Sequence, residues 1–76
     1  MSEWAAFQLW GEEAVRAALA EVSPDSVTAE LVRETQTYVD RPGVLRSWAV
    51  AQPWPRFCAI VRIISGTVLS ETMEDD

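Results

Sequence analysis

The first 22 residues alternate hydrophobic and polar positions with the period of a helix. With a turn of about 100° per residue, one face collects Trp4, Phe7, Gly11, Val15, Ala18 and Val22. Ser2 suits an N-cap, and the Ala, Glu and Leu content favours a helix. Gly11 is the weak point, because glycine inside a helix costs about 1 kcal/mol relative to alanine. The pattern predicts a helix over residues 2–22, with either a break into two shorter helices or a close contact at Gly11.

A second helical pattern follows a strong stop-and-restart signal. Ser23 suits an N-cap, Pro24 the first helical position and Asp25 the positively polarised first turn. The hydrophobic stripe continues from there at helical spacing, through Val27, Leu31, Val32, Tyr38 and Val39. The pattern predicts a helix over residues 24–39, followed by a turn over residues 40–43.

The next segments allow two interpretations. Residues 44–51 are too few for periodicity to decide between two helical turns and one strand. The most hydrophobic segment, residues 57–69, has an apolar helical face, while its β-branched residues also suit a strand over residues 57–64. Length and the preceding Pro55 favour the helix. The alternative is a β-hairpin over residues 44–64.

Two prolines frame Trp54. Each proline disfavours the α conformation in the residue before it. Pro53 and Pro55 therefore predict extended backbone at Gln52 and Trp54. This arrangement would hold Trp54 on a stiff corner that faces solvent or a partner.

These elements predict an all-α fold, a small bundle of three to four helices, and the hairpin alternative would make the fold α+β. A chain of 76 residues is one small domain, which we place at residues 1–69. Residues 70–76 are polar and acidic and predict a flexible tail. So short a chain buries only roughly 60% of the surface that it exposes when unfolded. Added stability from self-association or a binding partner is therefore expected.

The composition removes several kinds of site. Cys58 is the only cysteine, so no disulfide can form within the chain, and no histidine is present to complete a zinc site. Histidine is also the commonest general base. Paired acids such as Glu12 and Glu13 suit a solvated helix face, and Cys58 suits a small buried hydrophobe. We predict no catalytic residue, no metal and no cofactor, in a protein that is not an enzyme.

The net charge of −6, from 12 acids and six arginines with no lysine, bears on the partners. An acidic chain repels nucleic acids and anionic membranes, so protein partners are expected, without nucleic-acid or membrane contact. The longest hydrophobic run, which Arg62 interrupts, is shorter than the about 20 residues that span a bilayer. The N-terminus lacks the positive charge of a secretion signal. A lone thiol fits a reducing cytoplasm.

Four tryptophans in 76 residues are more than a small core needs, and surplus tryptophan is typical of contact surfaces. Packing against the proline corner explains Trp54 equally well, and a structural role is favoured for Trp48. Arg46 and Arg56 could stack on these rings or pair with acids of a neighbouring subunit. The partner-binding candidates are Trp10, Trp48, Pro53, Trp54, Pro55 and Arg56.

Four motifs follow one another over residues 24–72: Thr37-Tyr38-Val39 at a helix end, Pro53-Trp54-Pro55, the hydrophobic run 57–64 and the stretch 66–72. This order resembles the small head-to-tail connector (head completion) proteins of tailed bacteriophages. The resemblance implies a mostly helical subunit of a many-copy ring between portal and tail, located in the virion or the host cytoplasm. It also implies that Gly66, Ser70 and Glu71 begin an arm that reaches a neighbouring subunit, which adds Ser70 and Glu71 to the partner-binding candidates.

Two functional hypotheses of different kinds follow. The first is a structural interaction protein, a head–tail connector subunit in virion assembly, present as a homo-oligomer or as part of a larger assembly. The alternative is a small acidic inhibitor or adaptor that binds a host protein, with its carboxylates imitating the charge of nucleic acid. An enzyme or ligand-binding protein would need a pocket with convergent polar groups, and the sequence assigns none.

Overall fold

Helices account for all the regular structure of the computed structural model, which describes residues 3–66. The elements are α1 (Glu3–Trp10), α2 (Glu12–Glu21), the 3-10 helix η1 (Pro24–Ser26), α3 (Ala29–Tyr38), α4 (Pro42–Val50) and α5 (Trp54–Ser65). The predicted all-α fold is confirmed. The described residues hold five α-helices, more than the three to four predicted, and the hairpin over residues 44–64 is wrong because α4 and α5 occupy that segment.

Gly11 divides the first predicted helix into α1 and α2. Its φ of 92° lies in the left-handed region that glycine adopts without strain. Backbone hydrogen bonds continue on both sides, since the Gly11 amide donates to the Phe7 carbonyl (2.7 Å) and the Gly11 carbonyl accepts from the Val15 amide (3.1 Å). The break therefore changes the direction of the chain without leaving these groups of Gly11 unpaired.

The second predicted helix begins later than the sequence pattern indicated. Residues 24–26 form only the short η1, and Ser23 makes no side-chain capping bond there. Thr28 is the N-cap of α3, because its hydroxyl oxygen accepts a hydrogen bond from the Leu31 amide (3.1 Å). Val27, between the two elements, has a non-helical backbone. Serine and threonine are both good caps, and here the threonine supplies the bond.

The proline corner differs from its predicted geometry at Trp54. Pro53 is extended and caps α5, while Trp54 is the first residue of that helix rather than an extended residue. Pro55 is tolerated because the amide hydrogens of a first helical turn have no intrahelical acceptor. The Phe57 amide donates to the Pro53 carbonyl (2.8 Å) and closes this first turn.

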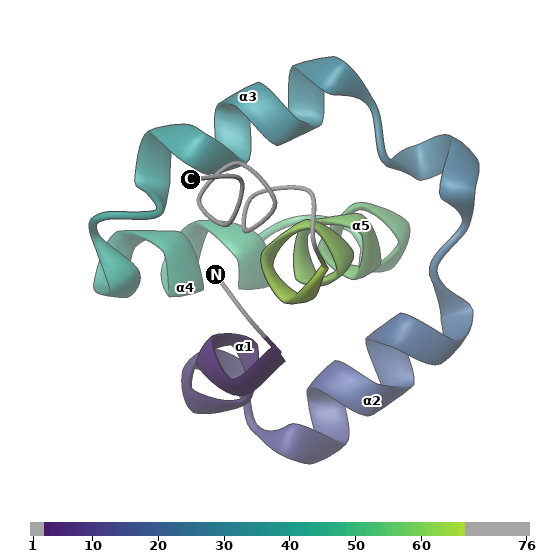
Figure 1. The fold of residues 1–76 in the computed structure, drawn as a ribbon, viewed down its shortest axis with the longest axis horizontal. Helices are drawn as coiled ribbons and strands as arrows, with labels where there is room; N and C mark the ends of the chain where they lie inside the picture. Colours follow the sequence, from purple (N-terminus) through teal and green to yellow (C-terminus); the bar gives the residue numbers. More distant parts are fainter. Residues whose placement is uncertain (1–2, 67–76) are drawn as a thin grey trace, which may run out of the picture.

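Helix α5 lies at the centre of the fold, and the other helices surround it (Figure 1). A helix that is hydrophobic on nearly all sides is stable only when its neighbours cover all of them. Its buried residues are Phe57, Cys58, Ala59, Ile60, Val61, Ile63 and Ile64. The prediction of a hydrophobic centre over residues 57–69 is confirmed for residues 57–64, and residues 67–69 lie outside the described range.

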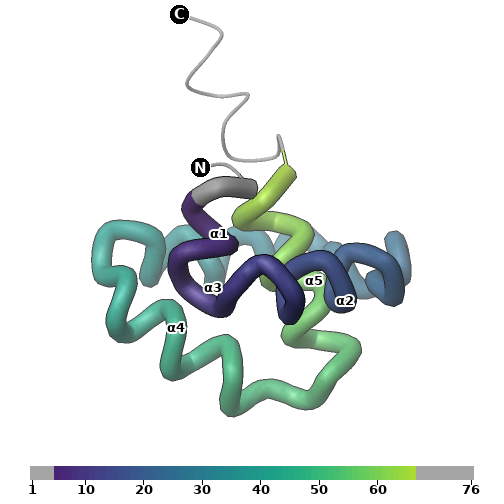
Figure 2. The backbone as a smooth tube through the Cα atoms, turned by 90° about the horizontal axis from the view of Figure 1, so that it is seen from below, coloured from purple at the N-terminus to yellow at the C-terminus, as the bar shows by residue number. Residues whose placement is uncertain are grey.

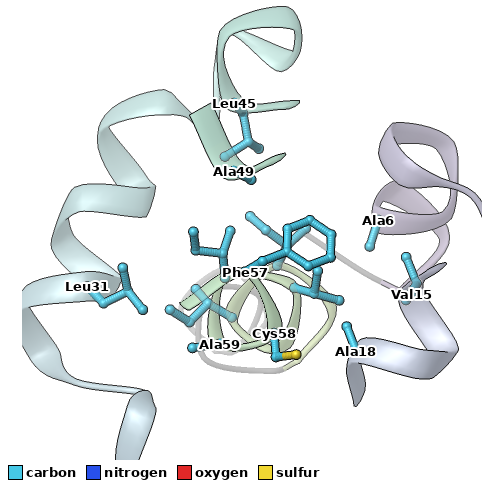
Figure 3. Packing of buried hydrophobic residues seen from close by; sticks show 13 residues of the cluster. Ala6, Val15, Ala18, Leu31, Leu45, Ala49, Phe57, Cys58 and Ala59 are labelled. Atoms are coloured by element: carbon cyan, nitrogen blue, oxygen red, sulfur yellow. The ribbon is translucent and has the colours of Figure 1, made fainter. Parts of the chain in front are cut away.

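The core is a single cluster around α5. The covering side chains come from different directions (Figure 3): Ala6 from α1, Val15 and Ala18 from α2, Leu31 from α3, and Leu45 and Ala49 from α4. Viewed from the side, the connection between α4 and α5 lies at the opposite end of the molecule from the end of α5 (Figure 2). The predicted tail, residues 70–76, lies outside the described residues.

The central position of Ile60 gives a first prediction. Ile60 is fully buried in α5, so the substitution Ile60→Ala should lower the free energy of unfolding by about 2–5 kcal/mol through lost burial and a new cavity. Urea unfolding followed by circular dichroism measures this loss. The matched control Ser47→Ala, on the exposed side of α4, should change stability by less than about 0.5 kcal/mol. Equal losses in both variants would contradict the placement of the core.

Two glycines should respond to alanine with opposite sign. No neighbouring atom would obstruct a Cβ at Gly11 or at Gly43, so backbone conformation alone decides. Gly11→Ala forces alanine into positive φ and should destabilise by about 1 kcal/mol or more. Gly43→Ala, within the first turn of α4, should stabilise by up to about 1 kcal/mol. Thermal unfolding of the two variants tests this, and a change of the same sign in both would contradict it.

Candidate protein-contact face

Three large hydrophobic side chains among the described residues are exposed rather than buried or half-buried, and two of them lie together. Val50 at the end of α4 is 59% exposed and Trp54 at the start of α5 is 44% exposed. With Gln52 and Phe57 they line an open groove of about 390 Å³. We call these four residues the Val50–Trp54 face. The third exposed residue, Val44, lies about 120° away from Val50 around α4.

Trp54 is held in place from two sides. Its indole Nε1–H donates to Glu21 Oε1 at the end of α2 (2.8 Å), and its ring stacks on Phe57 with centroids 5.6 Å apart. Phe57 is itself buried and forms a T-shaped pair with Trp10, with ring centroids 5.5 Å apart. Trp54 is therefore an exposed ring fixed to the core, in the geometry that aromatic pairs prefer.

Gln52 and Arg56 tie the face to the rest of the fold. The side-chain nitrogen Nε2 of Gln52 donates to the Trp48 carbonyl (3.0 Å). The side-chain oxygen Oε1 of Gln52 accepts from Arg56 Nε (3.0 Å). Arg56 also forms an ion pair with Glu34 of α3 (2.8 Å). Arg56 thus has an acid partner within its own chain, and its predicted contact with a neighbouring subunit stays a prediction. An exposed pair of this kind contributes at most about 1 kcal/mol.

The other two tryptophan candidates do not line this face, although each contacts one of its residues. Trp10 packs against the core, and its indole nitrogen is buried without a hydrogen-bond partner among the described residues. Trp48 is half-buried and packs on Tyr38 with ring centroids 4.8 Å apart. This packing supports the structural role that was favoured for Trp48, and its contact with a partner stays a prediction. Of the three tryptophans whose side chains the structure describes, Trp54 alone is strongly exposed.

The remaining candidates divide into exposed corner residues and residues beyond the described chain. Pro53 and Pro55 are exposed and flank Trp54 at the start of α5. Gly66 is buried as the C-cap of α5. Ser70 and Glu71 lie outside the described residues, so the proposed arm stays a prediction.

Sequence reasoning missed Val50 and Gln52, which line the face, and Glu21, which holds Trp54. Val50 is exposed because Leu45 and Ala49 direct the buried side of α4 inward, and this orientation becomes readable only once residues 42–50 are known to be helical. Glu21 and Gln52 gave no signal. Glu21 lies 33 positions before Trp54, and no local pattern predicts such a pairing.

The arginines near aromatic rings are not the ones that were expected. Arg16 lies over Phe7 (5.7 Å to the ring centroid) and Arg41 over Tyr38 (5.8 Å). The Arg46 side chain is exposed and makes no hydrogen bond or ion pair with any residue in the described range 3–66. Arg46 is therefore a free positive charge on α4.

Cys58 is the buried thiol that the sequence predicted, with only 1% of its surface exposed. Burial, and secondarily the Glu21 carboxylate, raise the pKa of the Cys58 thiol above its usual value. A thiol that is buried and protonated is a poor nucleophile and a poor metal ligand.

Two further features concern metals and membranes. Residues 3–66 contain no group of three or more acidic or cysteine side chains arranged to hold a metal ion. None of the helices in this range is long and apolar enough to cross a membrane.

Comparison with protein-family models, with curated proteins and with solved structures gave no match for the chain.

The raised pKa of Cys58 predicts a loss of stability at high pH. The unfolded chain releases the thiol proton once the pH passes the usual value of 9.0, while the folded chain still holds it. The contribution of this group is thus fully present below that pH and is lost as the pH rises through the folded pKa. Urea unfolding at neutral pH and above 9.0, with a reducing agent, should show a smaller decline for Cys58→Ala than for the unmodified protein. Identical declines would contradict the assignment.

Proposed function

We propose that this chain is a non-enzymatic interaction subunit of a larger protein assembly and that it contacts a protein partner through the Val50–Trp54 face. The observation that carries this proposal is Trp54, which is 44% exposed yet fixed by Glu21 and Phe57. Immobilising a flexible side chain on binding costs about 0.5–1.5 kcal/mol. A ring that is already held avoids part of this cost, and tryptophan is strongly enriched among residues that dominate binding energy.

The polar groups around the face support contact through apolar surface. The Trp54 indole N–H is occupied by Glu21, and the Gln52 oxygen by Arg56. Few unpaired donors and acceptors are left to orient a small polar ligand in the groove, as a ligand pocket requires. A flat apolar partner surface can cover these groups without leaving a donor or acceptor unsatisfied, because they are already hydrogen-bonded.

The finer proposal is a head-to-tail connector subunit of a tailed bacteriophage. Its support is the order of sequence motifs over residues 24–72, with which an all-α fold is compatible. A ring of many copies would supply intersubunit burial that a 76-residue chain lacks. The inhibitor alternative has less support, because Glu12 and Glu34 pair with arginines of this chain and Glu21 with Trp54.

The substitution Trp54→Ala tests the proposed contact. Binding to the assembly partner should weaken by about 30-fold or more, the loss typical of a dominant interface residue, while the melting temperature should fall only modestly. The measurement is affinity capture of the tagged protein from its native lysate with mass spectrometry, beside a thermal unfolding curve.

The control is Val44→Ala, which removes a similarly exposed side chain from another side of α4. It should leave capture unchanged. A Trp54→Ala protein that loses stability but still captures the same partners would show that Trp54 serves the fold alone. Recovery of portal, tail or capsid proteins would support the finer connector proposal, and recovery of a single host enzyme would support the inhibitor alternative.

A further inference from the structure

Unlike charges flank the Val50–Trp54 face on its two sides. Arg46 precedes Val50 by one helical turn, and the two side chains lie only about 40° apart around α4. Glu21 stands at the other side, where it accepts the Trp54 indole hydrogen. Along the face the order is therefore a positive charge, Val50, Trp54 and a negative charge. Figure 2 shows the underlying run of α4, the connecting turn and the start of α5 along one edge of the molecule.

Both flanking charges can serve a partner. Arg46 is exposed and makes no side-chain hydrogen bond or ion pair within residues 3–66. Glu21 is exposed and uses one carboxylate oxygen for Trp54, while a carboxylate can accept about four hydrogen bonds. Arg56, two residues after Trp54, is already paired with Glu34.

We infer that a second copy of this chain occupies the Val50–Trp54 face, in a two-fold symmetric dimer. The two-fold axis reverses the order of groups in the second copy, so that each group of one copy lies opposite its complement in the other. Val50 of one copy meets Trp54 of the other, and Arg46 meets Glu21, each pair occurring twice. A two-fold interface requires a surface that is self-complementary in this sense. The inference rests on the proposed function, since it names the partner of the same face.

The charge order favours a second copy over a uniformly charged partner. A basic segment laid on the face would meet Arg46, and an acidic one would meet Glu21, and like charges brought together at an interface are costly. A second copy avoids both of these like-charge contacts. It also covers Val50 and Trp54, the two most exposed large hydrophobic side chains in residues 3–66, and it supplies the extra burial expected of a small domain.

A charge-swap experiment tests the dimer. In Arg46→Glu the symmetric contact places two carboxylates together, and in Glu21→Arg it places two guanidinium groups together. Each variant alone should dimerise at least about tenfold more weakly than the unmodified protein, because like charges replace opposite ones at both contacts. Sedimentation equilibrium from micromolar to millimolar concentration measures the dissociation constants.

Mixing supplies the decisive comparison. A heterodimer of the R46E and E21R chains restores opposite charges at both contacts, as does the double variant R46E/E21R with itself. Both should recover dimerisation to within a few-fold of the unmodified protein. Loss of the Trp54–Glu21 hydrogen bond alone would weaken E21R but would give no recovery on mixing. Absence of recovery would overturn the inference.

The two proposals fail in distinguishable ways. A chain that stays monomeric up to millimolar concentration overturns the dimer. If Trp54→Ala still abolishes capture of a different protein in that case, the contact face stands and its occupant is not a second copy. If the chain dimerises and Trp54→Ala and the charge variants leave the dimer unchanged, the dimer uses another surface and the inference is overturned, while the capture experiment with Trp54→Ala still decides the contact face.

Discussion

The fold depends on covering one helix. Helix α5 is hydrophobic on nearly all sides, and no single neighbour can shield it. The chain meets this requirement with four helices of 8 to 10 residues each, placed around α5 (Figure 1). Isolated helices of this length are marginal in water, so their stability comes from packing. The break at Gly11 is needed for the same reason, because one straight helix over residues 2–22 could not wrap around a central one.

The Pro53–Pro55 corner links this core to the surface. The turn that brings the chain from α4 into α5 places Trp54 on the first turn of the central helix, and Phe57 one turn later is already buried. The two rings stack, so the exposed surface and the core share one aromatic contact. Glu21 and Gln52 then fix the corner from α2 and from the turn itself. A contact surface built in this way needs little ordering when it binds, since the folding of α5 has already positioned it.

The elements could be predicted from the sequence to the extent that the signals were local. The helical stripes and the hydrophobic centre over α5 came from periodicity and proline placement, and Gly11 was recognised as a possible break, whereas the turn predicted over residues 40–43 is shorter because α4 already begins at Pro42. Thr28 was missed as a cap because Ser23-Pro24 gave the stronger local pattern. The face was only partly predictable: Trp54 and its prolines were candidates, whereas the Trp54–Glu21 and Arg56–Glu34 pairs join residues 33 and 22 positions apart. Such pairings follow from tertiary packing.

Charge along the chain explains why the candidate face is polarised. Residues 1–40 contain eight acids and two arginines, whereas residues 41–66 contain four arginines and no acid. The acidic part, residues 1–40, forms α1, α2 and α3, and the basic part, residues 41–66, forms α4 and α5. Where helices of the two parts pack together, opposite charges therefore lie side by side on the surface. One such pair of opposite charges, Arg56 and Glu34, forms an ion pair within the chain. At the Val50–Trp54 face, α4 and α2 each contact α5 but not one another, which leaves Arg46 and Glu21 apart. A partner can pair with both Arg46 and Glu21 only if it presents a negative and a positive charge in the reverse order across an apolar surface. A second copy related by a two-fold axis presents its charges in that order.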